Sequence, residues 1–294
     1  MQLTHSLFSY LSLFLLLLVL NCQPSYSNKK PLKAVQGVLD LGSWDFDKDG
    51  PIQLAGQWEF HWNKFLHPQS KTKDIANNTI QENFPRYILV PKAWNDFQNN
   101  GKAVGSFGYA SYRLQIKTNS KKSLALRFKK IATAYQVFVN GKFLAKVGLP
   151  GKTQQTSTPQ YRSQVIDLPS IDAGKHMDLL LHISNFYHKK GGAWSNIDFG
   201  EKKQIHAIER RSLSFDLFLN GCFLIMGFYH LGLFLLRKKD RFTLYFGLFC
   251  LLMSLRSLLL EEISFYHLFP QVPFQWGLSI DYVTFYLGTP IFVL

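Results

Sequence analysis

The stretch Asp45–Gly50, with the sequence DFDKDG, places acidic side chains where a calcium-binding loop carries them. Carboxylates at positions one, three and five, with glycine at position six, open the loop of an EF-hand. The twelfth position should hold a glutamate that binds calcium through both oxygens, but here it is Gly56. Helical patterns on either side of the loop are also missing. We therefore expect a solvated turn that leads into a core strand, with no metal bound.

The other residues that could do chemistry do not form a catalytic set. The nine histidines include no pair at helical metal spacing, and His182 and His188 have no third partner in the sequence. Nucleophile elbows, phosphate-binding glycine loops and cysteine–histidine pairings are absent as well. We expect no cofactor and no catalysis from these residues. Whether the full-length protein is an enzyme stays open.

The N-terminus has the features of an export signal. Leu7–Leu20 is a charge-free, mostly apolar run, long enough for a signal-peptide core and short for a membrane span. Two cleavage sites stay open. Cys22 behind the run resembles a lipobox cysteine, which predicts lipidation of Cys22 and a signal ending at residue 21. Ser25 and Ser27 instead predict a signal peptide of residues 1–27. Both place residues 28–200 outside the cytoplasm.

Residues 28–200 have the pattern of an all-β domain. Segments rich in β-branched and aromatic residues are separated by turn residues, and several alternate apolar with polar side chains. Asn140-Gly141 is the dipeptide preferred in a type I′ hairpin, because both residues tolerate positive φ. At least six such strands without a helical repeat predict an antiparallel sandwich. The clearest segments are residues 109–118, 123–131, 134–148, 163–168 and 176–186.

Four pieces of this region, in this order, resemble the jelly-roll, galactose-binding-like domain that begins glycoside hydrolases of family two. They are LAGQWEFHW (54–62), VPKAWND (90–96), GYASYRLQI (108–116) and TAYQVFVNGKFLAKVG (133–148). The resemblance implies a jelly-roll sandwich. It implies no glycosidase activity, because those hydrolases keep their paired glutamates in a separate barrel domain that this sequence lacks.

Aromatic faces and planar hydrogen-bonding groups suit a carbohydrate or another small polar ligand. The residues that we select as candidate ligand contacts are Trp94, Tyr112, Arg113 and Trp194. The alternative for an aromatic residue in such a domain is a place in the core. We expect that place for Trp58, Trp94 and Tyr135.

Three apolar runs follow a juxtamembrane linker at residues 201–212. The first, residues 213–236, is 24 residues long, which spans a bilayer at a helical rise of about 1.5 Å per residue. His230 lies deep in this run and should face other helices. The second and third runs are residues 242–260 and 278–294. The third stops at Leu294 without a basic flank, which we interpret as truncation of a longer polytopic protein.

The turn between the first two runs is strongly basic, whereas the next loop, after residue 260, has no lysine or arginine. Basic residues mark cytoplasmic turns, so we interpret this turn as a topology anchor on the inside and place residues 28–200 outside. The anchor residues are Arg237, Lys238, Lys239 and Arg241. Basic residues just before the first run conflict in part with this orientation, but a signal peptide exports the domain regardless. These are Lys202, Lys203, Arg210 and Arg211.

The rest of the net charge of +14 is scattered along the chain. A nucleic-acid-binding protein would gather its basic residues in a stripe or a motif. We therefore predict no nucleic-acid partner. A basic surface beside anionic headgroups suits a lipid bilayer instead.

Residues 219–259 strongly resemble the start of the bacterial seven-transmembrane receptors with diverse intracellular signalling modules (7TMR-DISM). Gly-x-Tyr-His-x-Gly at 227–232, the basic turn and Tyr-Phe-Gly at 245–247 come in the order of that family. The resemblance implies an exported β-domain, seven helices in the bacterial inner membrane, a homo-oligomeric receptor and a cytoplasmic output.

The sequence thus predicts a multi-domain membrane protein: a receptor fragment whose sandwich senses a carbohydrate-like or other small ligand. Two alternatives stay open. The chain could be the N-terminal part of a membrane-bound nucleotide cyclase or sensor histidine kinase. It could also be a membrane-tethered carbohydrate-binding protein without a signalling role.

Overall fold

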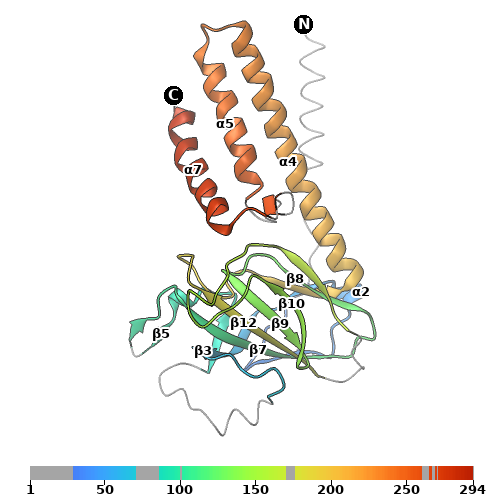
Figure 1. The fold of residues 1–294 in the computed structure, drawn as a ribbon. Helices are drawn as coiled ribbons and strands as arrows, with labels where there is room; N and C mark the ends of the chain where they lie inside the picture. The colour runs from blue at the N-terminus through green and yellow to red at the C-terminus, as the bar shows by residue number, and fades with distance from the viewer. Residues whose placement is uncertain are drawn as a thin grey trace.

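The computed structural model describes residues 29–70, 86–99, 101–169, 176–259, 265–266, 269 and 271–293. The predicted signal peptide and Cys22 lie outside the described residues. Figure 1 shows a β-rich body from which long helices extend to one side.

The β-rich body is a sandwich of two main sheets. Its strands are β1 (Val38–Leu41), β2 (Ile52–Gln53), β3 (Gly56–Trp62), β4 (Tyr87–Val90), β5 (Gln98–Asn99), β6 (Lys102–Ala103), β7 (Gly108–Thr118), β8 (Leu124–Phe128), β9 (Ala134–Val139), β10 (Lys142–Val147), β11 (Gln164–Asp167), β12 (His176–Asn185) and β13 (Ile197–Glu201). The larger sheet has the order β10-β9-β12-β7-β3-β4, with β1 parallel to β7. The smaller sheet has the order β11-β8-β13-β2, and β5 pairs with β6 alone. The predicted antiparallel sandwich is confirmed.

The predicted hairpin between β9 and β10 is also confirmed. Asn140 and Gly141 both have positive φ, 50° and 78°, as a type I′ turn requires. Lys142 pairs with Val139 directly across the turn.

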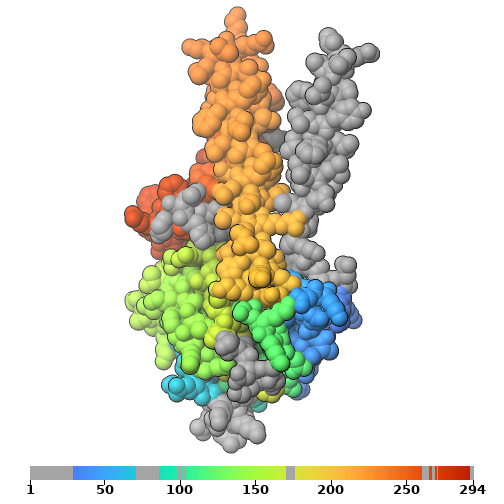
Figure 2. Space-filling model, turned by 90° about the vertical axis from the view of Figure 1, so that its right-hand side faces the viewer, coloured from blue at the N-terminus to red at the C-terminus, as the bar shows by residue number. Residues whose placement is uncertain are grey.

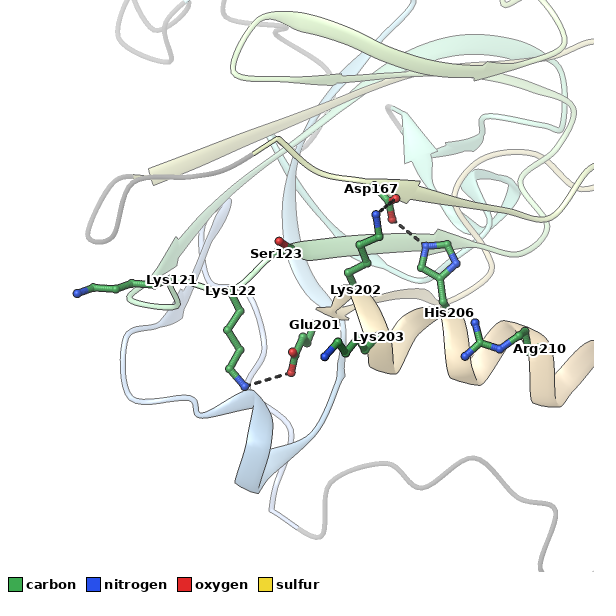
Figure 3. Close-up of a pocket in the computed structure, with 9 residues that line it drawn as sticks. All are labelled: Lys121, Lys122, Ser123, Asp167, Glu201, Lys202, Lys203, His206 and Arg210. Carbon is green, nitrogen blue, oxygen red and sulfur yellow. Dashed lines mark hydrogen bonds and ion pairs between the residues drawn. The ribbon is translucent and has the colours of Figure 1, made fainter.

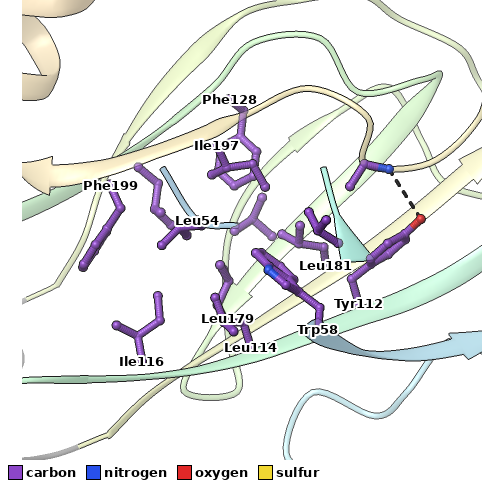
Figure 4. Packing of buried hydrophobic residues seen from close by; sticks show 14 of the residues in the cluster. Leu54, Trp58, Tyr112, Leu114, Ile116, Phe128, Leu179, Leu181, Ile197 and Phe199 are labelled. Carbon is purple, nitrogen blue, oxygen red and sulfur yellow. Dashed lines mark hydrogen bonds between the residues drawn. The ribbon is translucent and has the colours of Figure 1, made fainter. Parts of the chain in front are cut away.

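Large aromatic and aliphatic side chains from both sheets fill the space between them (Figure 4). Trp58, Trp94 and Tyr135 are fully buried, as the core interpretation of these aromatic residues predicted. Full burial of one large apolar side chain contributes about 1.5–3 kcal/mol. The domain has no cysteine between residues 28 and 200, so this core must hold it together without a disulfide.

The acidic stretch Asp45–Gly50 forms a one-turn helix, α2 (Phe46–Asp49), in place of the expected turn. The carboxylate of Asp45 accepts a hydrogen bond from the Asp47 backbone N–H at 3.0 Å. The Asp49 carboxylate forms an ion pair with Lys29 at 3.1 Å. The acidic side chains therefore cap the helix and bind lysine. Among the described residues, no group of three or more histidines, cysteines or carboxylates could hold a metal ion.

Three long helices follow the sandwich: α4 (Lys202–Leu236), α5 (Arg241–Ser257) and α7 (Phe274–Val293). The helix α4 is 35 residues long, or about 52 Å at the standard rise. It begins at the residue after β13, so the segment expected to be a linker, residues 201–212, is almost entirely helical. In Figure 2, α4 rises from the sandwich with its base against the body.

Polar and aromatic contacts join the helices to one another. The Asn220 side-chain amide on α4 donates to the Ser254 carbonyl of α5 at 2.8 Å. The Arg256 guanidinium on α5 forms an ion pair with Asp281 of α7 at 3.0 Å. The ring of His230 lies 4.6 Å from that of Phe246 on α5, centroid to centroid, so His230 faces a neighbouring helix as predicted.

Apolar side chains cover the outer surface of these helices. Within the described residues, α4 is the helix long and apolar enough to cross a membrane by length and composition. Ile225, Phe228 and Leu236 are among its exposed apolar residues. Exposed apolar surface on this scale marks contact with lipid or with other protein. The basic turn after Leu236 is exposed at the end of α4 farthest from the sandwich (Figure 1).

Candidate functional site: the junction between the sandwich and the helices

The last strand of the smaller sheet continues directly into α4. Glu201 ends β13 and pairs with Leu124 of β8, and the Lys202 N–H donates to the Ser123 carbonyl at 2.8 Å. The first turns of α4 contact β8, β11 and β13, and Ile205 is fully buried there. The side-chain amide of Gln204 donates to the Phe46 carbonyl at 2.6 Å. The sheet therefore fixes the direction in which α4 leaves the sandwich.

A charged groove of about 940 Å³ runs along this connection (Figure 3). Its residues come from the β7–β8 turn, the end of β11, the end of β13 and the first turns of α4. We call it the junction groove; it is lined by Lys121, Lys122, Ser123, Asp167, Glu201, Lys202, Lys203, His206 and Arg210.

Both carboxylates of the junction groove are paired with cations. Asp167 lies 2.6 Å from the Lys202 ammonium and 2.8 Å from His206 Nε2. Partial burial would raise the pKa of Asp167, but the hydrogen bonds from Lys202 and His206 lower it below its ordinary value. Glu201 lies 3.2 Å from the Lys122 ammonium. Asp167 thus ties β11 to α4.

Lys122 also binds the carboxylate of Asp47 on α2. The hydrogen bond with Asp47, together with the one with Glu201, raises the pKa of Lys122. Through Lys122, the β7–β8 turn therefore forms ion pairs both with α2 and with Glu201, the residue just before α4.

A second contact joins the sandwich to the α5–α7 connection through aromatic side chains. The rings of Tyr161 and Phe274 meet edge to face with centroids 4.7 Å apart. The Tyr266 hydroxyl donates to the Phe274 carbonyl at 3.2 Å. We call this set the aromatic contact; its buried members are Ala132, Tyr161, Leu259, Phe265, Tyr266 and Phe274, with Tyr187, Trp194, Leu255, Leu258, Val272, Leu278 and Ile280 packed against them.

The loop after β12 supplies cations to the aromatic contact. The Lys189 ammonium lies 5.3 Å from the ring centre of Tyr282 on α7, and that of Lys190 lies 4.7 Å from the ring of Trp194. The Tyr161 hydroxyl and the Trp194 indole N–H are buried there without a hydrogen-bond partner among the described residues. Burial also raises the pKa of the Tyr161 hydroxyl.

Two of the four candidate ligand residues lie in the core. Trp94 and Tyr112 are fully buried, so neither is open to a ligand in this arrangement. The Trp94 indole donates to the Ser106 carbonyl at 2.8 Å, and the Tyr112 hydroxyl accepts from the Ala193 N–H at 3.4 Å. A Cβ at Gly192 would lie 2.6 Å from the Tyr112 hydroxyl. Both aromatic residues thus support the loop at 191–194.

Trp194 and Arg113 lie in different places. Trp194 ends the supported loop and packs in the aromatic contact. Arg113 follows Tyr112 on β7 and points to the opposite face of the sheet, where its Nε and Nη2 each lie 2.7 Å from the carboxylate of Asp178. Trp94 and Tyr112 therefore lie in the core beside the loop at 191–194. Trp194 packs in the aromatic contact instead, and Arg113 lies apart from both places.

Sequence reasoning missed both contacts at the junction. One signal for the groove was present: Lys202, His206 and Arg210 are spaced four residues apart, which puts them on one face of a helix. The aromatic contact left no local signal, because Tyr161 and Phe274 are far apart in the sequence.

Comparison with protein families matches residues 212–294 to the model of the 7TM diverse intracellular signalling family. The matched residues comprise α5, α7 and most of α4. No curated protein matches the chain.

The sandwich is similar to parts of several solved glycoside hydrolases. A β-glucuronidase from an uncultured Clostridium has 13% identity and a TM-score of 0.37, over 52% of this chain and 29% of that one. A β-galacturonidase of family two from Eisenbergiella tayi has 18% identity and a TM-score of 0.35, over 51% and 24%. A family-two member from Bacteroides cellulosilyticus has 16% identity and a TM-score of 0.38, over 50% and 20%.

The chain thus spans less than a third of the hydrolases that it matches. The family resemblance predicted for the helices from the sequence is confirmed over residues 212–294. A β-sandwich precedes these helices.

Proposed function

We propose that the chain is the sensing and membrane part of a signalling receptor. The sandwich lies on the outer side of the bacterial inner membrane and binds a carbohydrate-like or other small polar ligand, and the helices pass the change inward to a cytoplasmic output. The observation that carries this proposal is the direct passage of β13 into α4, which makes one rigid element of a sheet strand and a membrane helix.

A rigid connection transmits movement that a flexible one would absorb. The predicted span begins at Leu213, 11 residues after the start of α4, so about 16 Å of helix stands between the sheet and the apolar segment. A tilt or shift of β13 must therefore move the outer end of the first membrane helix.

The aromatic contact gives the sandwich a second connection to the helices. A signal requires that a ligand bind more tightly to one arrangement of the helices than to another. Each buried polar group without a partner costs about 1–3 kcal/mol. Within the described part of the chain the aromatic contact holds two such groups, the Tyr161 hydroxyl and the Trp194 indole N–H. This penalty brings the closed contact nearer in free energy to an open one.

The candidate ligand residues take different roles in this proposal. Trp94 and Tyr112 support the loop at 191–194 from the core side. Trp194, at the end of that loop, packs against residues of α7, so movement of the loop is transmitted to the helix. A ligand that moves this loop would therefore change the aromatic contact without touching Trp94 or Tyr112.

The test uses the whole chain in lipid nanodiscs, with Cys22, Cys222 and Cys250 replaced by serine. Spin labels are attached to cysteines introduced at Lys146 of β10 and Lys239 of the basic turn. A panel of mono- and oligosaccharides is first screened for those that raise the melting temperature, since a ligand of the folded state must do so. We expect such a sugar also to change the distribution of distances between the two labels.

The matched control inserts a flexible Gly-Ser stretch between Glu201 and Lys202. The sugar should still raise the melting temperature of this variant, but the distance change should be reduced. A sugar that stabilises both proteins and changes the distances in neither would support the tethered carbohydrate-binding protein instead. If no sugar stabilises the chain, carbohydrate sensing is contradicted.

A further inference from the structure

Three lysines of the sandwich gather at the aromatic contact. The Lys130 ammonium lies 5.1 Å from the ring centre of Tyr161, and those of Lys189 and Lys190 lie over rings of the same contact. Burial lowers the pKa of His188 below its ordinary value, and the charges of these three lysines lower it further, against a hydrogen bond with the Lys190 carbonyl. The three ammonium groups therefore lie close to one imidazole. We call Lys130, Lys189 and Lys190 the lysine cluster.

The positive charge of the lysine cluster is not neutralised by the sandwich. Lys189 and Lys190 are exposed and form no ion pair with any residue that the structure describes. A cation over an aromatic ring is attracted by the ring but keeps its charge. The Asp281 carboxylate on α7 is already paired with Arg256 at 3.0 Å. The lysine cluster therefore has charge available for an anionic partner.

Contacts between the helices place the outer ends of the three predicted spans at one level. Asn220 lies seven residues inside the span of α4, and Ser254, which it contacts, lies six residues inside that of α5. Arg256 lies four residues inside the span of α5, and Asp281, its partner, lies three residues inside that of α7. Residues that touch are thus at nearly equal depth, so the three spans begin together.

Lys189 contacts α7 at this level. Tyr282, the ring under Lys189, lies four residues after Leu278, about 6 Å along the helix, and helical side chains point back toward the N-terminus. The headgroup layer on each side of a bilayer is about 5–7 Å thick. Trp276, in the first turn of α7, is 64% exposed, as suits an amphipathic aromatic residue in that layer. The lysine cluster therefore lies at the level of the headgroups, beside the start of α7, which Figure 1 shows just above the sandwich.

We propose that the lysine cluster binds the anionic headgroups of phospholipids and holds the sandwich against the membrane surface. Lysines near an anionic bilayer are attracted to it, and their apolar stems can pack on rings while the ammonium groups reach the headgroups. A dissolved anion would meet the same charges, but the cluster lies in a layer that is crowded with lipid phosphates. Binding of this kind requires that the helices lie in a bilayer and does not require that the chain signals.

The test maps contact with lipid along the whole chain in nanodiscs of phosphatidylcholine. Two probes are added at a low fraction: anionic phosphatidylglycerol and zwitterionic phosphatidylcholine, each with the same photoreactive group near its headgroup. After irradiation, lipid adducts on each peptide are measured by mass spectrometry, with a protease that does not cleave at lysine. We expect residues 186–194 to prefer the anionic probe by about tenfold.

The variant Lys189→Gln/Lys190→Gln should bring this preference close to one on residues 186–194. The basic turn, residues 237–241, serves as a reference within the same molecule, and its labelling should not change. The variant Lys189→Arg/Lys190→Arg keeps both charges and both ring contacts, so it should retain the preference. Together these variants separate lost charge from an altered loop.

The matched control Lys142→Gln/Lys146→Gln makes the same change in net charge on exposed lysines of β10. This strand belongs to the larger sheet, whereas the first turns of α4 contact the smaller sheet. The control should keep the preference of the unaltered chain.

Equal labelling of residues 186–194 by the two probes, or an unchanged preference in Lys189→Gln/Lys190→Gln, would overturn the proposal. A control variant that loses the preference to the same extent would also overturn it, because net charge alone would then attract the lipid. Loss of the preference in excess inorganic phosphate at constant ionic strength would do the same, because the lysines would then hold a dissolved anion. Since the readout is lipid contact and not a distance between labels, this proposal and that of a signalling receptor can fail separately.

Discussion

The ion pair between Arg127 and Asp198 should be a main determinant of the stability of the sandwich. The two residues face each other on β8 and β13, with Arg127 Nη1 at 3.1 Å from Asp198 Oδ2 and side chains only 1% and 0% exposed. The substitution Asp198→Asn keeps the shape of the side chain and removes its charge. The buried guanidinium of Arg127 would then face a neutral amide in place of the carboxylate.

Removing one partner of a buried ion pair costs about 3–5 kcal/mol. No discount for solvent applies here, because neither side chain is exposed. For a chain of this size each kcal/mol lowers the melting temperature by about 2–4 °C, so we expect a decrease of about 10 °C. The assay is thermal unfolding of the whole chain in detergent by tryptophan fluorescence, since five of the six tryptophans lie between residues 29 and 201.

Two controls make this reasoning refutable. Asp178→Asn breaks the pair with Arg113, in which the Asp178 side chain is 20% exposed, and should cost less. The double variant Arg127→Met/Asp198→Leu removes both charges and should recover most of the loss, because an apolar pair avoids desolvation of the charges. Two results would show that the ion pair is not what stabilises β13. One is a decrease in melting temperature for Asp198→Asn no larger than that for Asp178→Asn. The other is a double variant that is less stable than the single variant Asp198→Asn.

The remaining predictions concern acid stability and helix packing. Burial lowers the pKa of His182 from 6.5 to about 4. As the pH falls below 6.5, this histidine is therefore protonated in the unfolded chain before it is protonated in the folded one. Its full contribution to the free energy of unfolding is present above pH 6.5, and about 3 kcal/mol should be lost as the pH drops to 4. His182→Phe should remove this contribution and make the fall in melting temperature with decreasing pH shallower, although His188, whose pKa burial also lowers, still contributes. An unchanged slope would contradict the role of His182. On α4, a Cβ at Gly227 would lie 2.7 Å from Leu251 of α5, whereas one at Gly232 would meet nothing within 4 Å. Gly227→Leu should therefore lower the melting temperature of the helices, followed by far-ultraviolet circular dichroism, and Gly232→Leu should not; equal effects would argue against close α4–α5 contact.

Local patterns were enough to predict much of the fold. The Asn140-Gly141 turn depends on the backbone freedom of two adjacent residues, and the strands depend on a period of two, so both can be read within a short window. The alternation along β7 also implies that Tyr112 and Arg113 point to opposite faces. It does not tell which face is covered, and aromatic residues suit a core as well as a ligand site.

The junction depends on longer-range contacts. The start of α4 buries only Ile205 and Ile208 among charged neighbours, too weak an apolar stripe to distinguish a helix from a linker. Tyr161 and Phe274 meet only after the sandwich and the helices have both formed. The sequence alone therefore predicts the two parts but not the contacts between them.

The direct passage from β13 to α4 also limits which domains could replace the sandwich. One residue added after Glu201 would turn every following helical residue by about 100° about the axis and shift it by about 1.5 Å. Seven added residues would restore the angle to within about 20° but would raise the sandwich by about 10 Å, beyond the reach of the aromatic contact. Another domain can replace the sandwich only if its last strand meets Lys202 in the same helical phase. Whether a β-domain and these helices can be joined thus depends on the rotation of α4 about its axis at the Glu201–Lys202 connection as much as on the fit of their surfaces.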